Sequence, residues 1–199
     1  MPYPSFIDSS KDGDKAYDVY TRMMKDRIVF FQGEVEENMA NHLVASLLLL
    51  DSQNNNPIHM YVNSPGGQVT HGLAVYDTMQ LIKSPVHTIV IGQAASMGSL
   101  IAQSGDKRYI TKNARHMVHR VSSGTQGTSG SVHVQELEFE DAKRRLEESK
   151  KINEKLTQIY VDHNSKGKTY EEIYETLKFD TYLSPEEALE FGLVDEIIS

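Results

Sequence analysis

The chain has 199 residues, of which 39% are hydrophobic, which is enough to bury one substantial core. Its formal net charge is -8, from 28 acidic and 20 basic residues, which argues against a surface that binds nucleic acid through its phosphates. Cysteine is absent, which excludes disulfides and thiolate metal sites and fits a reducing compartment, so we expect a cytoplasmic protein. The sequence has no signal pattern and no apolar run long enough to cross a bilayer.

The first 14 residues are predicted to form a mobile arm, because two prolines and the polar run at residues 9–14 disfavour regular structure. Tyr3, Phe6 and Ile7 make an apolar cluster within this arm, and an exposed cluster of this kind usually has a partner. The alternative is a terminus that docks on its own domain.

From residue 16 onward, segments with helical periodicity alternate with short apolar runs typical of strands. This alternation predicts a single α/β domain, at residues 15–199, with helices packed on a sheet. Asn38 is expected to cap the second helix, and residues 184–187 form a capping box with proline at the first helical position. The predicted helices cover residues 16–24, 38–50, 73–83 and 170–177, and the predicted strands cover residues 27–31, 58–62, 86–91, 108–111, 116–119 and 193–194.

A long, highly charged helix is predicted from Val134 to Val161, after a loop rich in Ser, Thr, Gly and Gln at residues 122–131. Its apolar positions form a stripe too thin to anchor the whole helix to its own core. We therefore expect part of it to pack against another subunit, with a solvated surface helix as the alternative.

The segment Ile89–Leu100 is a strand of β-branched residues that passes through small residues and leaves as a helix. Ser96 sits at the sharp turn between them, where its hydroxyl can be exposed while neighbouring N–H groups face a reacting carbonyl. This is the position of a nucleophile, and the alternative is a serine that caps the following helix.

A second motif, Asn63-Ser64-Pro65-Gly66-Gly67, follows a strand and precedes a helix. Its two glycines permit positive φ and bring backbone N–H groups close to a ligand, which suits an oxyanion. By itself the motif is an ordinary turn, and it lacks the Gly-Lys-Ser/Thr of a phosphate loop.

Among eight histidines, His119 is the best-placed candidate base, at the end of an apolar strand, and His71 is the second choice. We reject a metal pair of His116 and His119, because three residues apart on a strand they point to opposite faces. Asp180 is the candidate orienting acid, whereas the acidic residues at 106, 162 and 195 are expected to be surface groups in turns.

Together these residues resemble the ClpP serine peptidases over nearly the whole chain. The resemblance rests on the following segments: Pro4-Ser5-Phe6-Ile7, Tyr17-Asp18-Val19-Tyr20-Thr21-Arg22, Ser64-Pro65-Gly66-Gly67, Tyr76-Asp77-Thr78-Met79-Gln80, Gly92-Gln93-Ala94-Ala95-Ser96-Met97-Gly98, Met117-Val118-His119, Leu183-Ser184-Pro185-Glu186-Glu187-Ala188 and Phe191-Gly192-Leu193-Val194-Asp195. The resemblance implies the ClpP/crotonase fold of stacked ββα units, with residues of about 132–161 as a protruding handle helix between two heptameric rings. It also implies that the loop at 122–131 pairs with the substrate as a strand.

The same resemblance implies that Ser96 is the nucleophile, His119 the base and Asp180 the residue that fixes the imidazole tautomer. The backbone N–H groups of Gly67 and Met97 then form the oxyanion hole. The implied substrates are unfolded polypeptides, fed by an AAA+ unfoldase that consumes the ATP, so no cofactor is expected on this chain.

In this family the unfoldase docks on the N-terminal arms and on apolar pockets between subunits. Tyr61, Leu81 and Tyr109 match positions of that pocket, and His59 replaces a usual aromatic residue there. Three further departures are Arg120 in place of Gln, Val121 in place of Pro, and Thr181 where an Arg often makes a contact between rings. The segment between His119 and Asp180 is also longer than usual.

Two rival functions remain at this stage. A crotonase-like acyl-CoA enzyme would use paired backbone N–H groups on the same fold, without needing the serine, histidine and aspartate together. A non-enzymatic ring subunit would assemble with an active paralogue.

Overall fold

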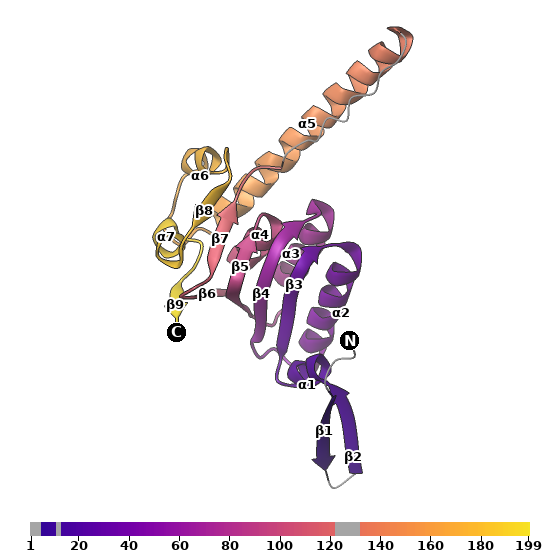
Figure 1. Cartoon of the computed structure of the whole chain (residues 1–199), viewed down its shortest axis with the longest axis vertical. Helices are drawn as coiled ribbons and strands as arrows, with labels where there is room; N and C mark the ends of the chain where they lie inside the picture. The colour runs from indigo at the N-terminus through magenta and orange to yellow at the C-terminus, as the bar shows by residue number, and fades with distance from the viewer. Residues whose placement is uncertain (1–4, 11–12, 122–131) are drawn as a thin grey trace.

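The structure is a computed structural model that describes residues 5–10, 13–121 and 132–199, and its described residues form nine strands and seven helices (Figure 1). The strands are β1 (Ser5–Ser10), β2 (Gly13–Asp18), β3 (Ile28–Val35), β4 (Ile58–Gly67), β5 (Val86–Ala95), β6 (Lys107–Thr111), β7 (Arg115–Val118), β8 (Thr181–Leu183) and β9 (Glu196–Ile198). The helices are α1 (Val19–Lys25), α2 (Glu37–Gln53), α3 (Val69–Leu81), α4 (Met97–Gln103), α5 (Val132–Asp162), α6 (Tyr170–Thr176) and α7 (Pro185–Phe191).

A mostly parallel sheet forms the centre of the domain, with the strand order β3-β4-β5-β6-β9. The first half of β5 pairs with β6 and its last three residues pair with β7, so the sheet divides at β5. β8 then adds antiparallel to β7. This division places β4, β5 and β7 side by side, and the carboxyl ends of all three lie at the same end of the sheet.

The core lies between one face of the sheet and helices α2, α3 and α4 (Figure 1). Alternate residues of the strands point into it, such as Phe31, Met60 and Ile110, and each of these is fully buried. The predicted α/β fold with helices packed on a sheet is therefore confirmed.

Several predicted boundaries are wrong, and a local hydrogen bond explains the first of them. The first helix begins at Val19 and not at residue 16, since the Asp18 carboxylate accepts the N–H groups of Tyr20 and Thr21 at 3.0 Å. The second helix has Glu36 at its N-cap position, without a side-chain bond, and not Asn38. The last strand begins at Glu196, after the predicted residues 193–194.

The predicted glycine turn at residues 63–67 is instead the last half of β4. It pairs with β3, where Val35 lies opposite Gly67, and with β5, where Ala94 lies opposite Ser64. Register shifts on both sides allow this half to run on as a strand in spite of Pro65.

Part of the predicted N-terminal arm is a regular hairpin, since residues 5–10 pair with residues 13–18. Ile7 is 62% exposed on it, and Tyr3 lies outside the described residues. The hairpin extends from one end of the domain, and α5 projects from the other (Figure 1).

The predicted long helix is confirmed as α5, and among its described side chains the buried ones lie near its C-terminal end. Leu156, Ile159 and Tyr160 are buried, whereas Leu146 is 63% exposed. The side chains at residues 132–139 and the loop at residues 122–131 lie outside the described residues, so the predicted role of that loop stays a prediction.

Candidate active site

Two parallel strands, β5 and β7, and the antiparallel strand β8 bring the candidate residues together at one end of the sheet. Ser96 follows β5 and His119 follows β7, and these strands pair through Ala95 and Met117. Asp180 immediately precedes β8, whose Thr181 pairs with Val118 at the end of β7. Ligands of open α/β sheets bind at such carboxyl ends of strands.

Ser96 has an unusual backbone conformation, with φ 54° and ψ -123°. Such conformations cost about 1–3 kcal/mol and persist at functional sites when the surroundings hold them. Its N–H donates to the Met117 carbonyl at 2.8 Å, which anchors the turn. Ser96 also occupies the N-cap position of α4, as the alternative interpretation expected, but its side chain makes no cap bond to the helix and contacts His119 instead.

The side chains of Ser96, His119 and Asp180 form one hydrogen-bonded array. His119 Nδ1 lies 2.9 Å from Asp180 Oδ1, and His119 Nε2 lies 2.8 Å from Ser96 Oγ. Because the carboxylate can only accept, Nδ1 donates to it, and Nε2 is left to accept the serine proton. The His119 side chain is 28% exposed and that of Asp180 is 62% exposed, so the array opens to solvent on one side.

The two predicted oxyanion donors are the backbone N–H groups of Met97 and Gly67. Met97 is the first residue of α4, and the first N–H groups of a helix have no partner within it. Gly67 ends β4, where a Cβ would lie only 2.5 Å from the Val35 carbonyl oxygen, so only glycine lets the two strands approach this closely.

Sequence reasoning missed the residue that holds the glycine segment in place. The buried Ser64 hydroxyl donates to the Gly33 carbonyl at 2.6 Å and accepts the Gly66 N–H at 3.0 Å. A small hydroxyl residue within a glycine motif is the sequence signal that could have identified Ser64.

A narrow cavity of about 20 Å³ adjoins Ser96 and His119. Its walls are mainly apolar side chains from α3, α4, α5 and the end of α6, so it suits an apolar group of a bound chain. The remaining lining residues are Val69, Met97, Leu100, Arg120, Val121, Asn153, Leu156, Tyr160 and Leu177.

Asn153 of α5 was also missed, and it holds the backbone just beyond His119. Its Oδ1 accepts the Val121 N–H at 2.8 Å, and its Nδ2 donates to the Val121 carbonyl at 3.2 Å. Arg120, which lies between His119 and Val121, donates to the Tyr174 hydroxyl at 3.1 Å. Both contacts fix this segment to helices rather than to the sheet.

The predicted docking residues are only partly brought together within one chain. Tyr61 and Tyr109 flank Ile89 on the face of the sheet that α2–α4 leave open, and His59 lies on the same face. Leu81 is 77% exposed, at the end of α3, which packs on the other face. The structure therefore places Leu81 apart from the other three.

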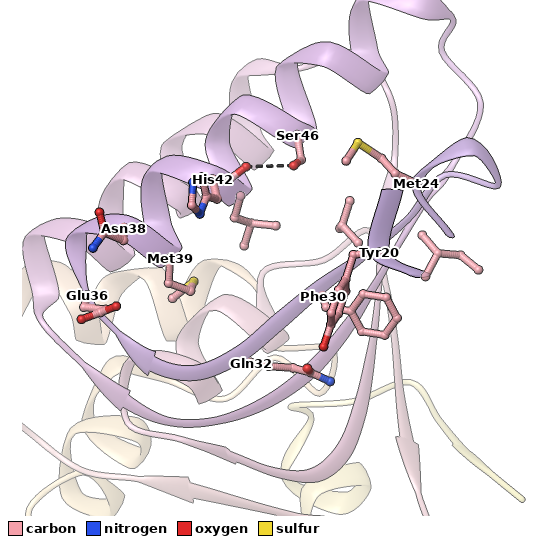
Figure 2. Close-up of a pocket in the computed structure, with 12 residues that line it drawn as sticks. Tyr20, Met24, Phe30, Gln32, Glu36, Asn38, Met39, His42 and Ser46 are labelled. Carbon is pink, nitrogen blue, oxygen red and sulfur yellow. Dashed lines mark hydrogen bonds between the residues drawn. The ribbon is translucent and has the colours of Figure 1, made fainter. Parts of the chain in front are cut away.

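A larger pocket, of about 450 Å³, lies far from Ser96, between α1, β3 and the start of α2 (Figure 2). Tyr20, Met39 and His42 are among the side chains that line it. It contains none of the predicted catalytic residues, so we assign no chemistry to it.

The other histidine predictions are also resolved in the geometry. His119, and not the second choice His71, reaches Ser96. His116 is fully buried against Ser99 on the other side of β7. Within the described ranges, no cluster of acidic residues and histidines is arranged to hold a metal, and no helix is long and apolar enough to span a membrane.

A serine, an imidazole and a carboxylate in hydrogen-bonded order is the arrangement of a serine hydrolase. A family model described as Clp protease matches residues 11–199. The chain therefore belongs to the Clp protease family, which agrees with the resemblance in its sequence and indicates a proteolytic subunit with serine peptidase activity in general.

Proposed function

We propose that this chain is the proteolytic subunit of a chambered serine protease that cleaves unfolded polypeptides to short peptides. One observation carries the proposal, namely the continuous hydrogen bonding from Asp180 through His119 to Ser96, at 2.9 and 2.8 Å. The three side chains come from sequence positions up to 84 apart, so the fold, and not local sequence, brings them together.

In the first half-reaction His119 Nε2 takes the Ser96 proton as Oγ attacks the scissile carbonyl carbon. The N–H groups of Gly67 and Met97 stabilise the oxyanion of the tetrahedral intermediate. The imidazolium, held by Asp180, then protonates the leaving amine, and an acyl-enzyme remains on Ser96. In the second half-reaction water, activated by His119, hydrolyses this ester.

The shape of the site supports a broad substrate range. The cavity beside Ser96 is small, and the array is partly open to solvent, so one apolar side chain at most is selected there. Access to the site, rather than the pocket, then decides which chains are cleaved, which suits a peptidase acting on unfolded polypeptides.

Assembly with other copies belongs to the same proposal. Clp protease family members generally work as oligomers with Clp unfoldases. Exposed leucines on α2 support this for the present chain, since Leu48 is 45% and Leu49 is 51% exposed, and α5 projects from the domain (Figure 1). We propose paired heptameric rings with α5 as the handle between them.

In such rings an AAA+ unfoldase of the Clp type docks on the N-terminal arms and at Tyr61, Leu81, Tyr109 and His59. Leu81 is apart from the other three within one chain, so a neighbouring subunit has to supply it to complete the pocket. The unfoldase consumes the ATP, this chain carries no cofactor, and the assembly works in the cytoplasm.

The experiment compares Ser96→Ala with Ser46→Ala, a half-buried serine on α2 whose hydroxyl donates to the His42 carbonyl of the same helix. Hydrolysis of a short fluorogenic peptide, labelling by a serine-reactive phosphonate, and native mass are measured on the same samples. We expect Ser96→Ala to lose hydrolysis and labelling at unchanged oligomeric mass, and Ser46→Ala to keep all three.

Equal hydrolysis by Ser96→Ala would remove Ser96 from the mechanism. A wild-type chain that is neither labelled nor active would favour the acyl-CoA enzyme or the inactive ring subunit.

A further inference from the structure

Beneath the nucleophile turn, three buried polar side chains connect α4, β7 and α5. The His116 Nδ1 and the Ser99 Oγ lie 2.8 Å apart, and both residues are fully buried. Burial raises the pKa of the Tyr160 hydroxyl, and a hydrogen bond with Ser99 acts against this shift. The Tyr160 hydroxyl in turn donates to the Ser96 carbonyl oxygen at 3.5 Å.

The tautomer of His116 determines in which direction this series of hydrogen bonds donates. Burial lowers the pKa of the His116 imidazole to about 3, so the ring is neutral and carries a single N–H. Its Nε2 has no partner among the described residues. A buried acceptor without a partner is tolerated better than a buried N–H without one, so the proton belongs on Nδ1.

With the proton on Nδ1, every hydrogen bond in the chain points the same way. His116 donates to Ser99, Ser99 donates to the Tyr160 hydroxyl, and Tyr160 donates to the carbonyl of Ser96. Hydrogen bonds that run in one direction polarise one another in a buried environment. Gln103 fixes the end of the chain, since its Nε2 donates to the Tyr160 carbonyl at 2.8 Å.

The accepting carbonyl of Ser96 belongs to the same planar peptide unit as the N–H of Met97. A hydrogen bond to that carbonyl therefore both orients the unit and makes its N–H a stronger donor. The Ser99 and Leu100 N–H groups also donate to this oxygen, at 3.0 and 3.2 Å. The Ser96–Met97 peptide plane is therefore held both by the backbone of α4 and by the Tyr160 hydroxyl. In the proposed mechanism, the Met97 N–H of this unit donates to the oxyanion.

We propose that Tyr160, aligned by Ser99 and His116, is a positioning residue that holds and polarises the Ser96–Met97 peptide as an oxyanion donor. This inference rests on the proposed peptidase function and adds to it a residue that touches no substrate-reacting atom. Its contact with the Ser96 carbonyl is long, at 3.5 Å, and we expect it to shorten when the oxyanion polarises the Ser96–Met97 peptide.

The test removes the hydroxyl in Tyr160→Phe and compares it with Tyr76→Phe. Tyr76 is the control, because its partly buried hydroxyl is also hydrogen-bonded but pairs with His163, at 3.3 Å, and not with the Ser96 carbonyl. We expect Tyr160→Phe to lower kcat on a fluorogenic peptide by about tenfold with KM unchanged, as expected for a contact that strengthens in the transition state. The inhibition constant of a peptide boronate, which forms a tetrahedral adduct on the serine, should rise by the same factor.

Ser99→Ala provides a second test, should Tyr160→Phe fail to fold. This variant keeps the Tyr160 hydroxyl and removes only its donor, so a smaller loss of kcat, paralleled by boronate affinity, is expected. Unchanged kcat and boronate affinity in either folded variant, or a loss that appears in KM alone, would overturn the inference. Failure of the proposed function is a different result, in which the wild-type chain itself neither hydrolyses the peptide nor binds the boronate.

Discussion

Gly66 and Ser96 pack so closely that no side chain fits between them. A Cβ at Gly66 would lie 2.7 Å from Ser96 Cβ, 2.6 Å from the Ala95 carbonyl oxygen and 3.1 Å from the Met97 nitrogen. Gly66 also has φ +89°, which disfavours any L side chain. The glycine of β4 therefore sets the position of the nucleophile turn from the neighbouring strand.

The variant Gly66→Ala is expected to lower kcat/KM by about a hundredfold, because displacing a reacting group by even 1 Å has this effect. It should also lower the free energy of unfolding by about 1–3 kcal/mol. Peptide hydrolysis and urea denaturation measure the two effects.

Gly33→Ala is the matched control for this prediction. Gly33 has φ +80°, and a Cβ there would meet no atom within 4 Å. The Gly33→Ala variant should therefore have the same kind of backbone strain as Gly66→Ala but keep its activity. Equal activity in the two variants would contradict a steric role for Gly66.

Asp180→Asn is expected to lower kcat by about a thousandfold, since an amide can donate to His119 Nδ1 and so stabilise the tautomer with its proton on Nε2. That tautomer cannot accept the Ser96 proton. Asp162→Asn, at the exposed end of α5, is the control and should leave kcat unchanged. Steady-state kinetics on one fluorogenic peptide compares them, and a loss of less than about threefold in Asp180→Asn would count against the orienting role.

Asn153→Ala is expected to lower kcat/KM by about tenfold, because it removes both hydrogen bonds that hold the Val121 backbone, at 2.8 and 3.2 Å. Losing them lets the segment after His119 move. Glu154→Ala, the exposed neighbour on α5, is the control. Limited proteolysis, followed by mass spectrometry, should show faster cleavage near residue 121 in Asn153→Ala only. Identical cleavage in both variants would show that Asn153 does not hold the Val121 backbone.

Stability should fall with decreasing pH because of His116. Burial lowers the pKa of this imidazole to about 3, against 6.5 for the ordinary group. Between these values the unfolded chain binds a proton that the folded chain excludes, so acidification lowers the free energy of unfolding by about 1.4 kcal/mol per pH unit. Above pH 6.5 this contribution is fully present, and it is lost as the pH falls toward 3.

His116→Asn removes this titration while leaving an amide that can bond to Ser99. Urea denaturation at several pH values between 4.5 and 7 should therefore show that the free energy of unfolding of the variant depends less steeply on pH, by about 1.4 kcal/mol per pH unit. Equal slopes in the two proteins would show that His116 is protonated in the folded state.

The sequence predicted the elements better than their ends. Hydrophobic periodicity located α3 and β5, and the capping box at Ser184 located α7, because these signals lie within a few neighbouring residues. The start of α1 and the glycine segment of β4 were misjudged. There, an Asp18 side-chain bond and pairing with two strands outweighed local propensity.

What the sequence determined by itself was the chemistry available, since local pattern and the family resemblance both indicate Ser96, His119 and Asp180. Only the tertiary structure decided that they meet, because the division of the sheet at β5 sets β7 beside the nucleophile strand and β8 beside β7. It alone also revealed the buried hydrogen bonds that link His116, Ser99 and Tyr160, which lie up to 61 positions apart in the sequence. Contacts of that kind follow from how helices pack on a sheet, and a local pattern cannot encode them.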